Sequence, residues 1–195
     1  MTLAHSIQDR YDDDDTSLDT GSGSGIVFIV SVSSSPQSRA GKLPRVLTII
    51  DYNIESMGDL DTNKYPTQHI QEIDLSDNLI SDWSQLDSIL STFPSLVFLN
   101  LARNLLSSPL ISTDLGTHSN LSKLILNGNK VSWSTVSTLL TKLPHLTELR
   151  LSHNGLTDPH HPLVTHQRLE ELWLSCNHIT SLASILTHVE QHCTK

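Results

Sequence analysis

Apolar and polar residues alternate along the chain in a pattern that recurs at a nearly constant interval. In each eleven-residue unit, leucine, isoleucine or valine fills the first, fourth, sixth and eleventh positions, and asparagine fills the ninth. Five units follow this pattern, beginning at Ile70, Leu96, Leu121, Leu146 and Leu169, with spacings of 26, 25, 25 and 23 residues. Alternation over the fourth to sixth positions is typical of a strand with one buried face. The period predicts one structural unit per repeat.

These units indicate a leucine-rich repeat solenoid. This is an α/β fold with a curved parallel sheet on its concave side and helices and irregular turns on its convex side. A degenerate repeat precedes the five, because residues 44–54 place Leu47, Ile49 and Ile54 in apolar positions although Tyr52 replaces the asparagine. Terminal repeats are often atypical. We therefore expect about six repeats.

Two of the connections between strands carry the spacing of an amphipathic helix. In residues 83–93 and 133–143, a tryptophan is followed by apolar residues 3, 6, 7 and 10 positions later, which form one face of a helix of about three turns. We expect Asp82 and Ser132 to act as N-caps and the following prolines to end the helices. A similar apolar face is expected after the sixth strand, over residues 182–189.

The N-terminal residues 1–41 are predicted to be a disordered tail, and residues 42–195 to be the leucine-rich repeat domain. The tail contains four consecutive aspartates at 12–15 and a glycine–serine linker at 21–25, a composition typical of flexible segments. An apolar run at 26–30 is the exception. It either adds a strand to the first repeat or stays unpaired.

The recurring asparagine has a structural interpretation. Backbone groups lose their sheet partners where each strand turns away, and neighbouring repeats bury them. A side-chain amide at that position can bond backbone groups of adjacent turns, and an unsatisfied buried group costs roughly 1–3 kcal/mol. We expect a ladder formed by Asn78, Asn104, Asn129, Asn154 and Asn177.

Composition narrows the classes of function. The 195-residue chain has a formal charge of −9 at pH 7, which argues against a nucleic-acid-binding surface. No apolar run approaches the roughly 20 residues of a membrane helix, and the N-terminus lacks the features of a secretory signal. The chain has only two cysteines, which favours a reducing, intracellular location. We expect a cytoplasmic protein that binds neither nucleic acid nor membrane.

Motifs for catalysis are missing, so we expect no enzyme, no catalytic residue and no cofactor. The sequence contains no nucleophile elbow, phosphate-binding loop or zinc-protease motif. Four histidines, at positions 153, 160, 161 and 166, are the strongest metal candidate. Their spacing matches no standard zinc module and their loop contains no cysteine. A polar surface loop is the simpler interpretation, and we predict no metal site.

Residues that flank the buried leucines are expected to lie on the concave face. Phe98, Ile125 and Trp173 are predicted to be exposed there, within a polar surround that resembles a protein interface. The alternative is that isolated exposed apolar residues are ordinary. We prefer the interface and predict partner binding through Asp74, Phe98, Asn100, Arg103, Lys123, Ile125, Arg150 and Trp173.

Several repeats resemble one particular family. The segment Asp74-Leu-Ser-Asp-Asn78 is followed by Asp82-Trp83 and by Pro94-Ser-Leu-Val-Phe-Leu-Asn-Leu101. Further matching segments are 124–127, 131–133 and 143–149. In this order they resemble the tubulin-specific chaperone cofactor E family, over about residues 43–187. Residues 1–41 lack a glycine-rich cytoskeleton-associated module, so the chain is most similar to the cofactor E-like branch.

The resemblance implies a function that the residues alone do not. It implies a non-catalytic, monomeric, cytoskeleton-associated protein that binds α-tubulin and influences tubulin folding, stability or turnover, and so microtubule organisation. It also implies a ubiquitin-like domain and later repeats that this sequence lacks, as expected of a truncated member. The alternative is a generic intracellular leucine-rich repeat adaptor, such as a phosphatase regulator, a splicing scaffold or a ubiquitin-ligase substrate receptor.

Overall fold

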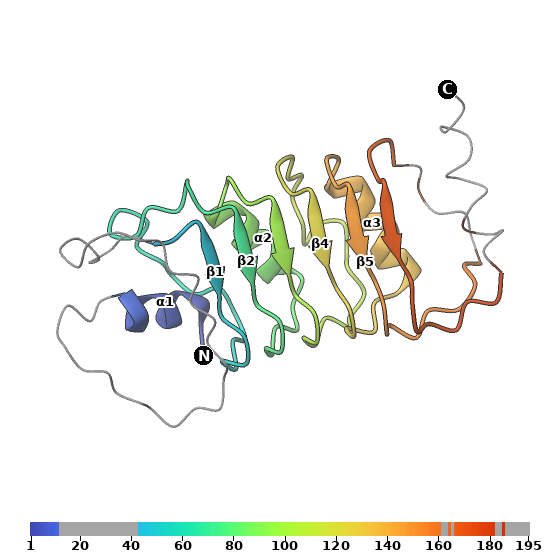
Figure 1. Cartoon of the computed structure of the whole chain (residues 1–195), viewed down its shortest axis with the longest axis horizontal. Helices are drawn as coiled ribbons and strands as arrows, with labels where there is room; N and C mark the ends of the chain where they lie inside the picture. Colours follow the sequence, from blue (N-terminus) through green and yellow to red (C-terminus); the bar gives the residue numbers. More distant parts are fainter. Residues whose placement is uncertain (12–42, 161–163, 165, 182–184, 186–195) are drawn as a thin grey trace.

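The computed structural model describes residues 1–11, 43–160, 164, 166–181 and 185. Six strands form one parallel sheet in the order in which they follow along the chain (Figure 1). The strands are β1 (Val46–Thr48), β2 (Glu72–Asp74), β3 (Phe98–Asn100), β4 (Lys123–Ile125), β5 (Glu148–Arg150) and β6 (Glu171–Trp173). This sheet confirms the predicted leucine-rich repeat solenoid with about six repeats.

Equivalent positions of successive repeats lie directly opposite one another. Leu99, for example, pairs with Ile73 on one side and with Leu124 on the other. The central residue of each strand points inward, and all are fully buried except Leu172 in β6, which is half-buried. Because side chains alternate across a strand, the two flanking residues of each strand share the opposite face. That face carries two columns of side chains that cross all six strands.

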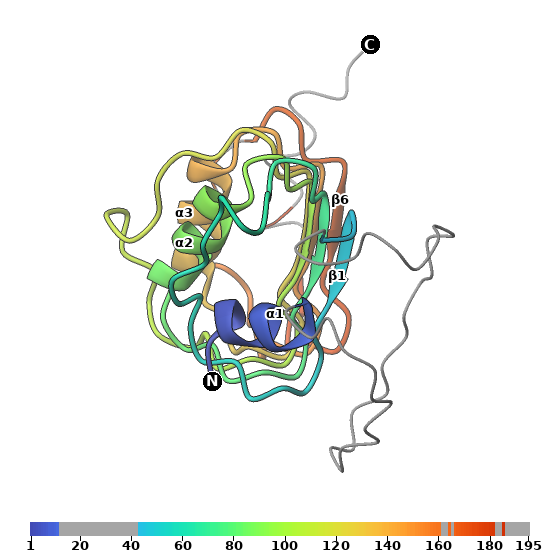
Figure 2. The same cartoon turned by 90° about the vertical axis from the view of Figure 1, so that its left-hand side faces the viewer.

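Two helices lie on the other side of the core from the sheet (Figure 2). Helix α2 (Ser84–Thr92) and helix α3 (Trp133–Lys142) each end two residues before a proline. Ser132 is the N-cap of α3, and its side chain accepts a hydrogen bond from the backbone N–H of Thr135. The prediction for α2 is wrong by one residue, because Trp83 occupies the cap position. Asp82 still accepts a hydrogen bond, at 2.8 Å, from the N–H of Ser84.

The first eleven residues differ from the predicted disordered tail, because they contain helix α1 (Leu3–Tyr11). Leu3 and Ile7 are fully buried and belong to the hydrophobic core. The N–H of Leu3 donates to the carbonyl oxygen of Ser56 at 2.8 Å, and Arg10 donates to that of Thr48 at 3.1 Å. Helix α1 thus lies across the end of the first repeat (Figure 2). The predicted tail is wrong for these residues, since apolar side chains at 3, 4 and 7 give the helix one buried face.

Other predictions fall outside the described residues. They include the remainder of the tail with its apolar run at 26–30, and most of the helical face over 182–189. Ile185 is described, and it is buried. Among the described residues, no helix is long and apolar enough to cross a membrane.

Candidate partner-binding face

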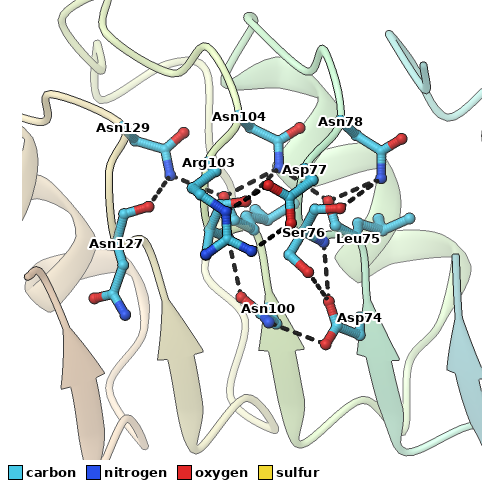
Figure 3. Close-up of polar contacts among 12 residues, drawn as sticks. Asp74, Leu75, Ser76, Asp77, Asn78, Asn100, Arg103, Asn104, Asn127 and Asn129 are labelled. Carbon is cyan, nitrogen blue, oxygen red and sulfur yellow. Dashed lines mark hydrogen bonds and ion pairs between the residues drawn. The ribbon is translucent and has the colours of Figure 1, made fainter. Parts of the chain in front are cut away.

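The turn after each of the strands β2 to β6 is fixed by an asparagine side chain that joins two repeats (Figure 3). The amide of Asn104 donates to the carbonyl oxygen of Leu75 at 2.9 Å and accepts from the N–H of Ile80 at 3.0 Å. Asn154 makes equivalent bonds to Leu126 and Val131. Asn78, Asn129 and Asn177 also bond backbone groups of the preceding repeat. These bonds fix the position of each strand end, and they therefore fix the positions of the side chains on the concave face.

The residue before each ladder asparagine has a left-handed backbone. Positive φ angles of 57°, 53°, 71°, 60° and 56° occur at Asp77, Arg103, Gly128, His153 and Cys176. This bend places Arg103 in the turn beyond β3, where its guanidinium forms a two-point ion pair with Asp77 of the preceding repeat (Figure 3). The hydrogen bond from Arg103 lowers the pKa of Asp77. Arg103 is thus at the rim of the concave face, and its guanidinium is already paired with Asp77.

Asp74 and Asn100 form a second internal group, on β2 and β3. Asp74 accepts hydrogen bonds from the N–H of Ser76 at 2.9 Å and from its hydroxyl at 2.7 Å. Asn100 donates to Asp74 at 3.0 Å and accepts from the N–H of Ala102 at 3.0 Å. These side chains therefore brace the turns that follow their strands.

The three apolar residues predicted to be exposed on this face differ in exposure. Phe98 on β3 and Ile125 on β4 are half-buried. Phe98 lies in register between Glu72 and Lys123, and Ile125 lies between Asn100 and Arg150. Trp173 on β6 is 47% exposed. The prediction of an exposed side chain is therefore correct for Trp173 only. Val46 in β1 is also exposed on this face, at 39%, but Trp173 is the larger side chain and lies at the β6 end of the sheet.

Four side chains from β4, β5 and β6 form what we call the anchor cluster: Lys123, Glu148, Arg150 and Trp173. Lys123 and Glu148 are directly opposite in the β4–β5 register, and Arg150 and Trp173 are opposite in the β5–β6 register. Lys123 Nζ lies 3.1 Å from Glu148 Oε2. Arg150 Nε lies 2.6 Å from Glu148 Oε1, and its guanidinium carbon lies 5.0 Å from the Trp173 ring centroid.

Glu148 is the buried centre of this cluster, with a residue exposure of 6%. Burial alone would raise the pKa of its carboxyl group. Hydrogen bonds from Arg150 and Lys123, together with their positive charges, outweigh that effect and lower the pKa. Glu148 is consequently ionised at neutral pH and holds two cationic side chains in place. The guanidinium stacked on an indole is a cation–π contact, which is favoured for tryptophan.

Sequence reasoning assigned no role to Glu148, although a signal was present. Lys123 and Glu148 occupy the third position of successive repeats, and equivalent positions must face each other across a parallel sheet. Glu148 and Arg150 share a face because they are two residues apart on one strand. The repeat frame thus predicts the proximity of all three. Their hydrogen bonds depend on side-chain conformations, which the frame does not determine.

The histidines of the candidate metal cluster do not meet in the described structure. His153 and His160 are exposed, His166 lies 3.0 Å from the carbonyl oxygen of Leu143, and His161 is outside the described residues. Among the residues that the structure describes, no group of three potential ligands could hold a metal ion.

Comparison with known proteins identifies relatives of the chain. A family model described as leucine-rich repeats (2 copies) matches residues 144–188. Tubulin-specific chaperone cofactor E-like proteins of Rattus norvegicus and Homo sapiens are 35% and 33% identical over 178 residues, which is 91% of this chain and 42% of each relative. The chain is a leucine-rich repeat relative of the cofactor E-like proteins. Tubulin-specific chaperone E of Bos taurus is 32% identical over 144 residues, 73% of this chain and 27% of that protein.

The similarity to the tubulin-specific chaperone cofactor E family inferred from the repeats is therefore confirmed. The cofactor E-like relatives match over most of the chain, whereas chaperone E of Bos taurus matches over a shorter part. The chain spans less than half of the length of each of these relatives. All six strands belong to the repeats that carry the similarity, and the anchor cluster is built on three of them.

Proposed function

We propose that this chain is a non-catalytic, cytoplasmic and cytoskeleton-associated cofactor that binds α-tubulin as a monomer. Through that binding it influences the folding, stability or turnover of tubulin, and so the organisation of microtubules. The relatives are named as tubulin-specific chaperone cofactors, which supports tubulin as the partner. The six strands supply an open face of the kind that a protein partner can cover.

One observation carries the choice of surface. Trp173 is the most exposed aromatic side chain that the structure describes on this face, at 47%, and it is stacked by Arg150. Tryptophan and arginine are the residues most enriched among those that dominate binding energy. Their contact is already formed without a partner, so little conformational entropy is lost when they bind.

The remaining concave residues have smaller proposed roles. Six strands spaced at about 4.8 Å give a face roughly 24 Å wide, which can supply much of the roughly 800 Å² that a stable interface buries on each partner. Phe98 and Ile125 contribute apolar area, and Asp74 and Asn100 contribute polar contacts. Arg103 and Lys123 assist electrostatically, but each is already paired with a carboxylate, so we expect them to change the salt dependence of binding more than its strength.

The proposal is tested by measuring the affinity of the full chain for purified tubulin with biolayer interferometry. Replacing Arg150 or Trp173 by alanine should each cost roughly 1–3 kcal/mol of binding free energy. Trp173 lies outside the buried core, so its replacement should change the urea midpoint little, whereas Arg150→Ala should lower the midpoint modestly because the buried Glu148 loses one of its two partners. Cross-linking through Lys123, followed by mass spectrometry, would identify which tubulin chain faces the anchor cluster.

A matched control uses an exposed apolar residue and an exposed arginine outside the six strands. Ile111→Ala/Arg168→Ala also removes one exposed apolar and one exposed cationic side chain and should leave the affinity unchanged. A folded Arg150→Ala/Trp173→Ala variant with wild-type affinity would overturn the concave face as the binding surface. The adaptor alternative would be favoured if the wild-type chain does not bind tubulin but captures phosphatase, spliceosomal or ligase subunits from cell extract.

A further inference from the structure

The concave face contains one carboxylate whose position is unusual. Glu148 occupies a strand position that points toward solvent, yet it is buried, whereas Glu72 and Glu171 in the same column are half-buried and exposed. The neighbouring long side chains cover it. A carboxylate is rarely buried unless it is paired, and Glu148 is paired on both of its oxygens.

The two partners of Glu148 come from different directions. Lys123 approaches Oε2 from β4, and Arg150 approaches Oε1 from two residues along β5. The guanidinium is thereby held at Nε, and its carbon sits over the Trp173 ring. The indole N–H of Trp173 donates to Glu171 at 3.1 Å. Both members of the Arg150–Trp173 pair are therefore oriented by a carboxylate.

The arrangement leaves hydrogen-bond donors available on the concave face. An arginine has five N–H donors, and the described residues accept only the one at Nε of Arg150. The side chain remains 41% exposed. Its Nη groups can therefore reach an acceptor on a partner, such as a carboxylate or a main-chain carbonyl, while the exposed indole offers apolar contact area.

We propose that Glu148 is a positioning residue for partner binding. It clamps Lys123 and Arg150 and so holds the Arg150 guanidinium against Trp173, ready to receive an acceptor group of the partner protein. This inference rests on the proposed concave-face function and adds a residue that makes no contact with the partner. An arginine that is already ordered loses less entropy on binding than a free one.

The first test needs no partner. The variant Glu148→Gln keeps the size of the side chain but removes the charge that holds two cations, and Glu72→Gln is the matched control in the same column. In proton–nitrogen NMR spectra, the three tryptophans give three indole signals, and Trp173→Phe identifies the one from Trp173. Glu148→Gln should shift that signal because Arg150 leaves the ring, and Glu72→Gln should not. Equal spectra of the two variants would overturn the positioning role.

The second test measures binding to purified tubulin as a double-mutant cycle. Because two long side chains lose their clamp, Glu148→Gln should weaken binding roughly fivefold to tenfold, whereas Glu72→Gln should not. If Glu148 acts mainly through Arg150, the effect should be much smaller when Arg150 is already alanine, because only Lys123 then loses its partner. An equal loss in both backgrounds would overturn the inference. Wild-type chain that does not bind tubulin would overturn the proposed function alone, and the NMR comparison would still decide the positioning role.

Discussion

The side-chain amide of Asn129 joins its own repeat to the preceding one, because Nδ2 lies 2.8 Å from the carbonyl oxygen of Leu101. The side-chain oxygen of Asn129 faces the N–H of Leu106 in the same preceding repeat, at 3.4 Å. Both backbone groups are buried. The carbonyl oxygen of Leu101 also accepts from Asn104 at 3.1 Å, whereas Asn129 is the one partner that the described residues offer to the N–H of Leu106.

Replacing Asn129 by alanine should destabilise the protein by about 1–3 kcal/mol, the cost of leaving the buried N–H of Leu106 unpaired. The urea midpoint from circular dichroism measures this change. Asn63→Ala is the matched control, because Asn63 is exposed and lies outside the ladder. A midpoint for Asn129→Ala that equals that of Asn63→Ala would mean that water replaces the lost bonds.

The inward column of leucines should be the main source of stability. Leu126 is fully buried within the core cluster, so Leu126→Ala should cost roughly 2–5 kcal/mol through lost burial and a new cavity. The same substitution at Leu105, which is 53% exposed, should have a much smaller effect. Similar urea midpoints for the two variants would contradict the repeat frame.

The repeat pattern predicts much of the fold, because a strand needs only alternating apolar residues and each repeat supplies the same neighbours to the next. It predicts the strands around Leu99 and Leu124, and the helix that follows Trp133, within a few residues. It does not predict α1, which has no repeat motif and whose apolar positions at Leu3, Ala4 and Ile7 stand in a polar segment. Its burial depends on the end surface of the first repeat, which no local pattern reveals.

The packing of α1 on the first repeat gives a direct prediction. Ile7 is fully buried, so Ile7→Ala should lower the free energy of unfolding by about 2–5 kcal/mol if the whole domain unfolds together. His5 lies on the same helix and is exposed, so His5→Ala should cost little. A disordered N-terminus would give wild-type midpoints for both variants in urea titrations.

The sequence predicts less of the candidate site than of the fold. The frame placed Lys123, Ile125, Arg150 and Trp173 on one face, because strand residues alternate. It could not show that Phe98 and Ile125 are half-covered, since exposure depends on the conformations of neighbouring long side chains. The repeat frame likewise does not predict the clamp at Glu148, because the clamp depends on the distances from its carboxylate to Lys123 and Arg150.

Two glycines with the same backbone conformation allow strain and contact to be separated. Gly128 and Gly155 have φ angles of 71° and 72°, so alanine at either site carries a left-handed strain of about 1–2 kcal/mol. A Cβ at Gly128 would lie 3.3 Å from Cγ of Arg103, whereas one at Gly155 would have nothing within 4 Å. Gly128→Ala should therefore be the more destabilising in urea titrations. Equal costs would show that Arg103 moves aside freely.

The lowered pKa of Glu148 makes its contribution to stability depend on pH. A carboxyl group whose pKa is lower in the folded protein stabilises the fold fully above its unfolded pKa of about 4.3. This contribution is lost as the pH falls through the lower folded pKa. Both cationic partners are about half exposed, so the contribution should be modest, on the order of 1 kcal/mol.

Comparison of wild-type chain with Glu148→Gln isolates this contribution. Asp77 and Asp87 also have lowered pKa values, but they titrate equally in both proteins and their effects cancel in the difference. The variant should unfold at a lower urea concentration at pH 7, and the gap should narrow steadily below about pH 4.3. The urea midpoint of Glu72→Gln should not differ from that of the wild-type chain by such a gap, at pH 7 or at acid pH. A gap for Glu148→Gln that stays constant from neutral to acid pH would mean that hydrogen-bond geometry, rather than the charge of Glu148, holds Lys123 and Arg150 in place.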